Sequence, residues 1–253
     1  MKDTPKVIAV ASGKGGIGKS SLTCTLAVRL AQLEPECRVL VFDADGQSMS
    51  STDYFLREVD PDEIEQANAY HVLTERQTVD RVARRSAAGV DVVAAHPMMS
   101  RAGAEMMSDR GAILRMRSAI LSGDHDLVLI DCPPSLDSFS TAAALYSADL
   151  VLAPTSMERW CRQGLGLLLD EVNRVERTRG GPPLVRVVPS IVTLKEAETL
   201  RFTLEGVVAV TARGFYKSAE IRRAMQRAVP VREGTPSWSD VNELAREVLG
   251  VLG

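Results

Sequence analysis

Short apolar runs alternate with longer amphipathic stretches along the 253 residues of the chain. Several runs are unbroken Val, Ile and Leu, which is typical of strands buried on both faces of a parallel sheet. The predicted strands are 7–11, 38–42, 90–94, 127–130, 150–153, 185–192 and 207–210. The predicted helices are 20–33, 71–86, 101–121, 138–146, 159–177, 195–205, 218–227 and 239–249. This alternation predicts an α/β fold with a doubly wound, mostly parallel sheet and helices on both faces, in one domain over 1–253.

A glycine-rich segment follows the first predicted strand and leads into the first predicted helix. Its spacing satisfies G-x-x-x-x-G-K-[ST], the P-loop pattern. Glycines let backbone N–H groups converge on a polyphosphate, and the helix start adds a positive dipole end. A glycine-rich turn without an anion is the alternative, but it leaves two adjacent lysines uncompensated. We expect the nucleotide to contact Gly13, Lys14, Gly15, Gly16, Ile17, Gly18, Lys19, Ser20 and Ser21.

Two residues of this loop have defined chemical roles in a P-loop. Lys19 is expected to reach the β- and γ-phosphates, and the Ser20 hydroxyl to bind Mg²⁺. Lys14 is a second lysine inside the loop, which an ordinary P-loop does not need. The loop contacts only the phosphates, so on its own it would bind GTP and ATP equally well.

Carboxylates follow two further predicted strands, at the edge where a doubly wound sheet binds its ligands. Asp43 and Asp45 follow the second strand two residues apart, so both can face the phosphate pocket. One can organise the loop or the metal shell, and the other can position a water for attack on the γ-phosphate. Asp131 ends the strand 127–130 and fits a carboxylate that holds Mg²⁺ through water. The alternatives are a solvated acidic turn at 43–45 and a helix N-cap at Asp131.

The composition is ordinary for a globular protein, with 45% hydrophobic and 25% charged residues and a net charge of −3. Overall charge therefore does not indicate a nucleic-acid partner. The N-terminal residues lack an apolar signal-peptide core, and the four cysteines form no C-x-x-C pair. We expect a cytoplasmic protein without structural zinc, and an aromatic content of 4% argues against base-stacking platforms.

Taken in order, the motifs resemble those of the ParA/MinD family of deviant Walker A ATPases. Residues 14–20 look like the deviant Walker A motif, and 42–47 resemble the D-x-D-P-Q segment, with Gly46 in place of the usual proline. Residues 131–135 resemble D-x-P-P-S, and 148–154 resemble A-D-x-V-L-x-P, which ends at Pro154. Residues 212–214 stand where many members have P-R-N. The asparagine often found near adenine is absent around Ser190, so adenine contacts are not assigned.

The resemblance implies an ATPase that uses ATP and Mg²⁺ and forms a C₂-symmetric homodimer around two nucleotides. Lys14 would then cross to the partner's nucleotide, as an arginine finger does, and Asp45 would position the attacking water. The expected catalytic residues are thus Lys14, Asp45 and Lys19. Asp43 and Pro154 are further expected nucleotide contacts, and the expected metal site consists of Ser20, Asp131 and Asp45. Hydrolysis in this family is slow and is stimulated by a partner.

Residues 177–227 contain ten Lys or Arg and four Glu. ParA-like members bind DNA without sequence preference, and a dimer doubles the charge available for phosphate contacts. The alternative for any one of these residues is an ordinary solvated helix face. The DNA-binding candidates are Lys195, Arg201, Arg213, Lys217, Arg222, Arg223 and Arg227.

The leading hypothesis is a partitioning ATPase associated with the nucleoid, whose partner resembles the centromere-binding ParB proteins and which segregates plasmid or chromosomal DNA. A related ATPase that positions a protein cargo is the second. A MinD-like membrane regulator is the third, although the acidic C-terminal stretch lacks the basic, bulky residues of a membrane anchor, so no membrane is expected. An iron–sulfur carrier of the same superfamily is the fourth. Only twelve residues precede Gly13, so we expect no N-terminal DNA-binding domain.

Overall fold

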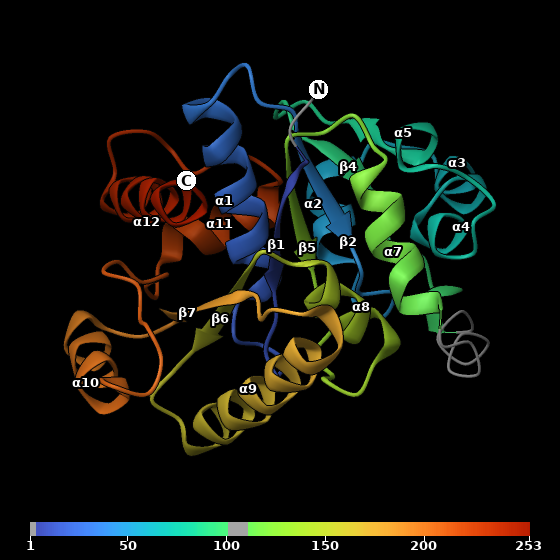
Figure 1. The fold of residues 1–253 in the computed structure, drawn as a ribbon. Helices are drawn as coiled ribbons and strands as arrows, with labels where there is room; N and C mark the ends of the chain where they lie inside the picture. Colours follow the sequence, from blue (N-terminus) through green and yellow to red (C-terminus); the bar gives the residue numbers. More distant parts are fainter. Residues whose placement is uncertain (1–3, 101–110) are drawn as a thin grey trace.

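The computed structural model describes residues 4–100 and 111–253 (Figure 1). Seven strands form one sheet in the order β3-β4-β2-β5-β1-β6-β7. Every neighbouring pair is parallel except β3 and β4, which confirms the predicted mostly parallel sheet. The strands are β1 (Lys6–Val10), β2 (Val39–Asp43), β3 (Arg84–Arg85), β4 (Asp91–Val93), β5 (Leu127–Asp131), β6 (Leu150–Thr155) and β7 (Leu184–Pro189).

Helices cover both faces of the sheet, as the doubly wound pattern predicts (Figure 1). Successive residues of β1 enter two separate cores. Val7 and Ala9 pack under α8 (Phe139–Ser147) and α9 (Arg159–Arg179), whereas Ile8 and Val10 pack under α1 (Lys19–Leu33) and α12 (Pro236–Leu252). The described helices are α1 (Lys19–Leu33), α2 (Ser50–Leu56), α3 (Pro61–Gln66), α4 (Ala69–Leu73), α5 (Val79–Val82), α7 (Ala112–Leu121), α8 (Phe139–Ser147), α9 (Arg159–Arg179), α10 (Leu194–Leu204), α11 (Ala219–Arg227) and α12 (Pro236–Leu252).

Three predicted elements differ from the structure. The single helix predicted over 71–86 is wrong: the chain leaves α4 with Glu75 at φ 57°, forms the short α5, and then pairs Arg84 with Val92 of β4. The strand predicted over 207–210 is reduced to one isolated bridge, between Val187 and Val210. The last strand ends at Pro189 rather than at 192. Residues 101–110 of the helix predicted over 101–121 lie outside the described residues, and α2 and α3 were not predicted.

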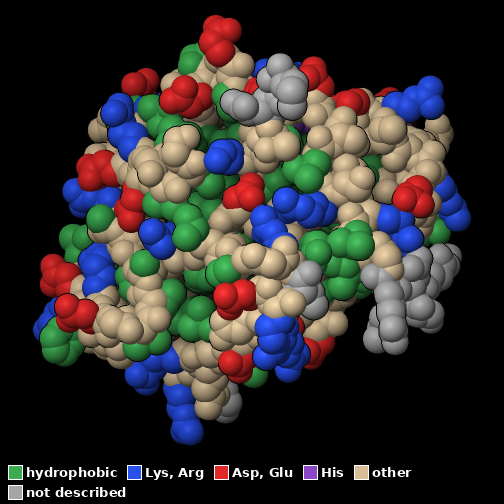
Figure 2. Space-filling view, in the orientation of Figure 1, with side chains coloured by type: hydrophobic (Ala, Val, Ile, Leu, Met, Phe, Trp, Pro, Cys, Tyr) green, Lys and Arg blue, Asp and Glu red, His purple; other side chains and the backbone are tan. Residues whose placement is uncertain are grey.

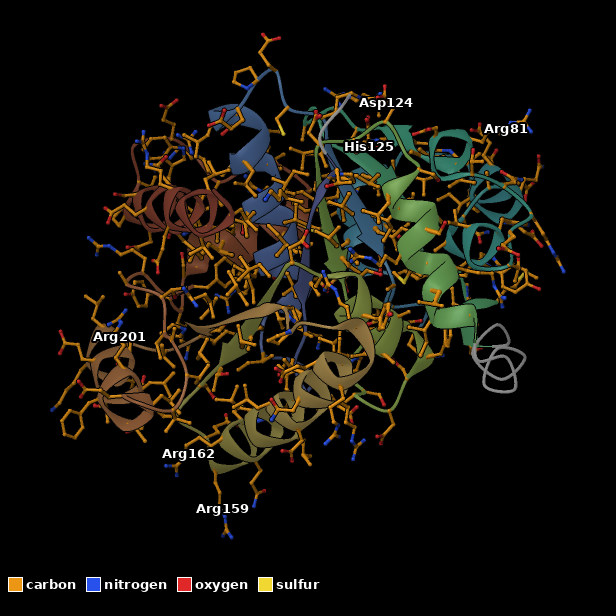
Figure 3. All side chains as sticks on the ribbon, in the orientation of Figure 1. Arg81, Asp124, His125, Arg159, Arg162 and Arg201 are labelled. Carbon is orange, nitrogen blue, oxygen red and sulfur yellow. The ribbon has the colours of Figure 1, made fainter. Side chains whose placement is uncertain are left out.

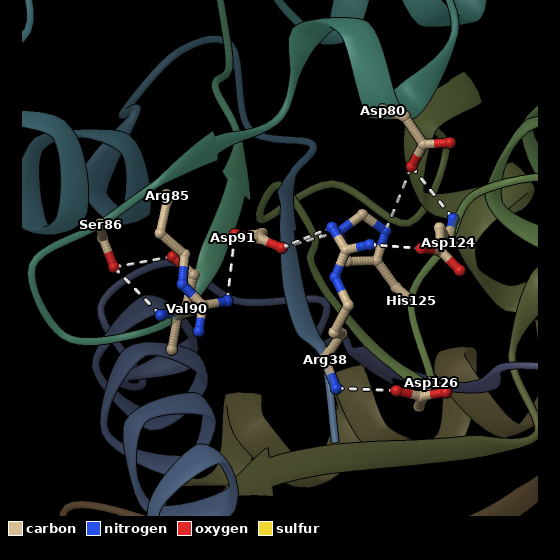
Figure 4. A network of polar contacts seen from close by, with 9 residues as sticks. All are labelled: Arg38, Asp80, Arg85, Ser86, Val90, Asp91, Asp124, His125 and Asp126. Carbon is tan, nitrogen blue, oxygen red and sulfur yellow. Dashed lines mark hydrogen bonds and ion pairs between the residues drawn. The ribbon is translucent and has the colours of Figure 1, made fainter. Parts of the chain in front are cut away.

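A polar network lies at the amino ends of the strands, away from the P-loop (Figure 4). His125 is 1% exposed, and its Nε2 lies 3.1 Å from Asp91 Oδ2. Arg85 and Arg38 also bind Asp91, and Arg38 extends the network to Asp124. Burial lowers the pKa of His125. Buried polar groups at this edge are therefore largely paired with one another.

Candidate functional site

The P-loop connects β1 to α1 and forms a rim that is open to solvent. Gly18 has φ 87°, a left-handed backbone that lets the loop turn directly into α1 without a Cβ penalty. Lys19, the first residue of α1, is 7% exposed, and its Nζ donates to the carbonyl oxygen of Lys14 across the loop at 3.1 Å. The Ser190 hydroxyl donates to the carbonyl oxygen of Ile17 at 2.7 Å and closes the loop from the β7 side. The loop is therefore folded around the Lys19 ammonium.

Lys19 is an anion-binding group held in a partly dry place. Burial lowers its pKa, and the negative charge of Asp131 opposes this effect. An ammonium so placed gains most from a ligand that brings negative charge, because burial without a partner is costly. The nucleotide-contacting role predicted for Lys19 fits this environment.

Asp131 ends β5 next to β1 and is completely buried. Its Oδ2 accepts a 2.6 Å hydrogen bond from Ser51 of α2, whereas its Oδ1 is buried without a hydrogen-bond partner among the described residues. Burial raises the pKa of Asp131 to about 6, against the opposing effect of the Ser51 hydrogen bond and of the neighbouring Ser20 hydroxyl. An unpaired carboxylate oxygen beside Ser20 fits a water-mediated Mg²⁺ shell.

No group of three or more His, Cys, Asp or Glu side chains in the described ranges forms a metal cage. Mg²⁺ keeps several waters and takes other ligands from substrate phosphates, so it needs few protein ligands. Ser20 and Asp131 would hold it, and it would neutralise charge on the β- and γ-phosphates. Asp45, the third predicted metal residue, accepts hydrogen bonds from the backbone of Gln47 and from the Ser48 hydroxyl.

Asp43 and Asp45 both organise the loop after β2. Asp43 is fully buried, and it accepts hydrogen bonds from the backbone and hydroxyl of Thr52, both at 2.8 Å, and from the backbone of Asp45. Asp45 Oδ1 accepts from the backbone of Gln47, and its Oδ2 accepts from the Ser48 hydroxyl at 2.7 Å. These contacts give Asp43 a structural role and hold Asp45, which is 5% exposed, in a fixed orientation.

Helix α2 supplies residues that the sequence prediction missed. Ser51 and Thr52 bind Asp131 and Asp43, which tie α2 to the ends of β5 and β2. The two aspartates are also direct neighbours across these strands, and burial together with the charge of Asp131 raises the pKa of Asp43 to about 8. The serine-rich run at 48–51 was the available signal, because Ser and Thr are short hydroxyl donors.

A pocket of about 470 Å³ opens beside the P-loop. It begins at Gly18 and Ser21 and extends over an apolar wall from the segment after β7 and from α11. Ligand pockets are mostly apolar with a few polar groups, so its position and lining suit the base of a bound nucleotide. The sequence did not assign these residues; the wall includes Ile191, Phe215, Tyr216, Ile221 and Met225.

Lys14 forms an ion pair with Glu158, which stands at the N-cap of α9. The Glu158 hydrogen bond raises the pKa of Lys14. Arg159 and Arg162 on the same helix point outward instead (Figure 3). Pro154, the remaining predicted nucleotide contact, is buried in β6, where it pairs with Val188 of β7.

The seven basic candidates divide into two groups. Arg201 donates to the carbonyl oxygens of Thr211 and Ala212, and Arg213 forms an ion pair with Glu243, so both are used inside the fold. The face drawn in Figure 2 mixes acidic and basic side chains without a continuous basic patch. The other five candidates are exposed: Lys195, Lys217, Arg222, Arg223 and Arg227.

These features fit a P-loop nucleotide-binding protein: a glycine-rich loop between β1 and α1, a buried lysine, a buried carboxylate at the end of β5 and a pocket beside the loop. A family model described as an AAA domain (AAA_31) matches residues 5–181. The chromosome partitioning protein ParA of Caulobacter vibrioides is 30% identical over 239 residues, covering 92% of this chain and 84% of that protein. The sporulation initiation inhibitor protein Soj of Bacillus subtilis is 27% identical over 196 residues, covering 77% and 74%.

Solved structures confirm the fold. A variant of McdA from Cyanothece in complex with ATP matches with a TM-score of 0.83 and 19% identity, covering 98% of each chain. A plasmid partition protein of Borrelia burgdorferi B31 bound to AMPPNP matches with a TM-score of 0.77 and 22% identity, covering 97% of this chain and 99% of that one. The chain belongs to the ParA/MinD family of P-loop ATPases. This membership confirms the resemblance drawn from the motifs. P-loop ATPases use ATP together with Mg²⁺.

Proposed function

We propose that this chain is a ParA-type partitioning ATPase that dimerises on ATP, binds DNA nonspecifically and is released when a partner stimulates hydrolysis. The observation that carries the proposal is Lys14, a second lysine at the solvent-facing rim of the P-loop. Lys19 already supplies the loop with its buried cation, so the phosphates of the chain's own nucleotide do not need Lys14. The similarity to chromosome partitioning proteins named ParA supports the partitioning assignment.

In the proposed reaction each chain supplies three groups. Lys19 binds the β- and γ-phosphates of its own ATP, and Asp45 orients the attacking water from its fixed position after β2. Lys14 crosses to the partner's ATP and neutralises charge that develops during phosphoryl transfer. Ser20 and Asp131 would hold Mg²⁺, which would supply positive charge beside the bound phosphates. The site is then complete only in the dimer, which makes hydrolysis slow in single chains.

The DNA-binding surface proposed here centres on α11. Arg223 and Arg227 are exposed on this helix, and both line a shallow cavity of about 370 Å³ with Arg232. Arg222 lies on the same helix but also lines the pocket next to Gly18, so a change there affects nucleotide binding as well. Lys195 and Lys217 are exposed and complete the candidate set. Arg201 and Arg213 are left out because the fold uses them.

The remaining parts of the proposal are the partner and the location. A ParB-like protein bound to a centromere site would stimulate hydrolysis, and the ATP dimer would reside on the nucleoid. None of the helices within 4–100 and 111–253 is long and apolar enough to cross a membrane. Pelleting with liposomes in the presence of ATP, without DNA retention, would instead support a MinD-like regulator.

The proposal is tested by binding to nonspecific duplex DNA with ATP, ADP or no nucleotide over a salt series. We expect binding with ATP only. R223E/R227E removes two contacts per chain and four per dimer, so the slope of log K against log salt should fall by about 3 to 4. R81E/R177E is the matched control, because Arg81 and Arg177 are exposed on α5 and α9. Equal DNA binding in all nucleotide states would contradict the proposal.

The role of Lys14 has its own test. K14Q is expected to retain ATP binding, because Lys19 and the loop backbone are unchanged, and to lose most ATP turnover. Turnover is measured with duplex DNA present, and nucleotide binding with a fluorescent ATP analogue. Full turnover by K14Q would refute the cross-dimer role.

A further inference from the structure

The ion pair between Lys14 and Glu158 joins two segments that are 144 residues apart in sequence. Glu158 is the N-cap residue of α9, yet its side chain makes no cap hydrogen bond to that helix. Arg162, one helical turn further on, is exposed and forms no ion pair with it within the described ranges. The carboxylate is therefore committed to the P-loop and not to its own helix.

A backbone contact holds the start of α9 in place. Gly164, on the second turn of α9, is buried against the P-loop, and a Cβ built on it would lie 3.6 Å from the Cα of Gly13. Helix and loop therefore touch without any side chain between them. Because this contact fixes the helix, Glu158 reaches Lys14 from an anchored position and is not a freely moving surface acid.

We propose that Glu158 is a positioning residue for Lys14: it retains the lysine on its own chain until dimerisation breaks the ion pair. The inference rests on the proposed function, in which Lys14 acts on the partner's nucleotide. A lysine bound to Glu158 is not available to a second chain, so each dimer must open two such pairs. Glu158 thereby opposes dimerisation, and the nucleotides that receive the lysines compensate for the loss.

The exposure of the pair sets the size of this effect. The side chains of Lys14 and Glu158 are 35% and 61% exposed, so water and salt screen the attraction. Exposed ion pairs of this kind shift an equilibrium by about 1.5- to fivefold. Two pairs per dimer then weaken dimerisation by about 2- to 25-fold. An ion pair of this strength weakens dimerisation without preventing it.

The test compares E158Q with E171Q, a matched change on the same helix, where Glu171 pairs with Arg174. The dissociation constant of the dimer is measured by analytical ultracentrifugation with a nonhydrolysable ATP analogue and Mg²⁺, at low and high KCl. E158Q should tighten the dimer by about 2- to 25-fold at low salt, with a smaller gain at high salt, and E171Q should leave it unchanged. An unchanged or weaker E158Q dimer overturns the inference.

A double variant shows whether Glu158 acts through Lys14. In a K14Q background, E158Q should no longer change the dissociation constant, and a gain that persists overturns the inference. The two proposals fail separately. If K14Q loses ATP turnover while E158Q leaves dimerisation unchanged, only the role of Glu158 is wrong. If K14Q keeps full turnover, the proposed function itself is wrong.

Discussion

Gly46 follows Asp45 at the end of β2, where the family usually has proline, and the structure predicts that a Cβ is not tolerated there. A Cβ built on Gly46 would lie 2.6 Å from the carbonyl oxygen of His96 and 3.1 Å from the Cβ of Met99. That carbonyl already accepts a hydrogen bond from the Met99 backbone, so the turn cannot retreat without losing it. G46A should therefore destabilise the fold through a clash with the backbone at His96, and not through a loss of loop flexibility.

Overpacking of this kind costs about 1 to 3 kcal/mol. A chain of this size loses about 2 to 4 °C in Tm per kcal/mol, so G46A should unfold about 2 to 12 °C lower than the wild type. G46P carries the same Cβ and should lose at least as much, although it restores the family's usual residue. The assay is thermal unfolding followed by circular dichroism without nucleotide.

G166A is the matched control, because Gly166 lies in the interior of α9 and a Cβ there meets nothing within 4 Å. Replacing a glycine in mid-helix stabilises by about 0.5 to 1 kcal/mol, so its Tm should rise by about 1 to 4 °C. Opposite shifts from two Gly-to-Ala changes isolate the contact with His96. A wild-type Tm for G46A would refute the reasoning.

Two further predictions concern titratable groups. Burial lowers the pKa of His125 in the folded chain. Below about pH 6.5 the unfolded chain therefore binds a proton at this histidine that the folded chain does not bind. The free energy of unfolding of the wild type then falls by at most about 1.4 kcal/mol per pH unit as the pH decreases. The stability difference between the wild type and H125N should therefore narrow as pH falls from 7 to 5, and a gap constant with pH in denaturant titrations would contradict this. D131N should raise Tm, because it removes a buried charge beside Asp43. It should also weaken the Mg²⁺ dependence of ATP binding. If ATP binding by D131N depends on Mg²⁺ as strongly as that of the wild type, Asp131 is not part of the metal shell.

The P-loop and the strand-end aspartates could be predicted from sequence because their signals are local. Gly13 to Ser20 carry a fixed spacing, and unbroken apolar runs locate the buried strands that end at Asp43 and Asp131. Parallel strands then bring these carboxylates to one edge without any knowledge of long-range contacts. The assignment of Asp45 beside them followed from its spacing of two residues.

The rest depends on contacts between distant segments. Glu158 reaches Lys14 from α9, and Phe215 reaches the P-loop pocket from beyond β7; neither pairing has a local signature. Charge type was equally uninformative for Arg213, which lies between α10 and α11, because the Glu243 that neutralises it lies 30 residues away on α12. The helix predicted over 71–86 failed because Glu75 adopts a left-handed backbone, which an amphipathic pattern does not reveal.

Asp43 and Asp131 stand opposite each other across β2 and β5, both fully buried. The chain thus carries two acids in its interior, and one of them has an oxygen that no described residue satisfies. A cation that binds there reduces the free-energy cost of burying these acids. Because it binds the folded form, mass action then favours folding. Resistance to proteases should rise with the supply of magnesium nucleotide, so the lifetime of this protein in a cell would follow the energy state of that cell.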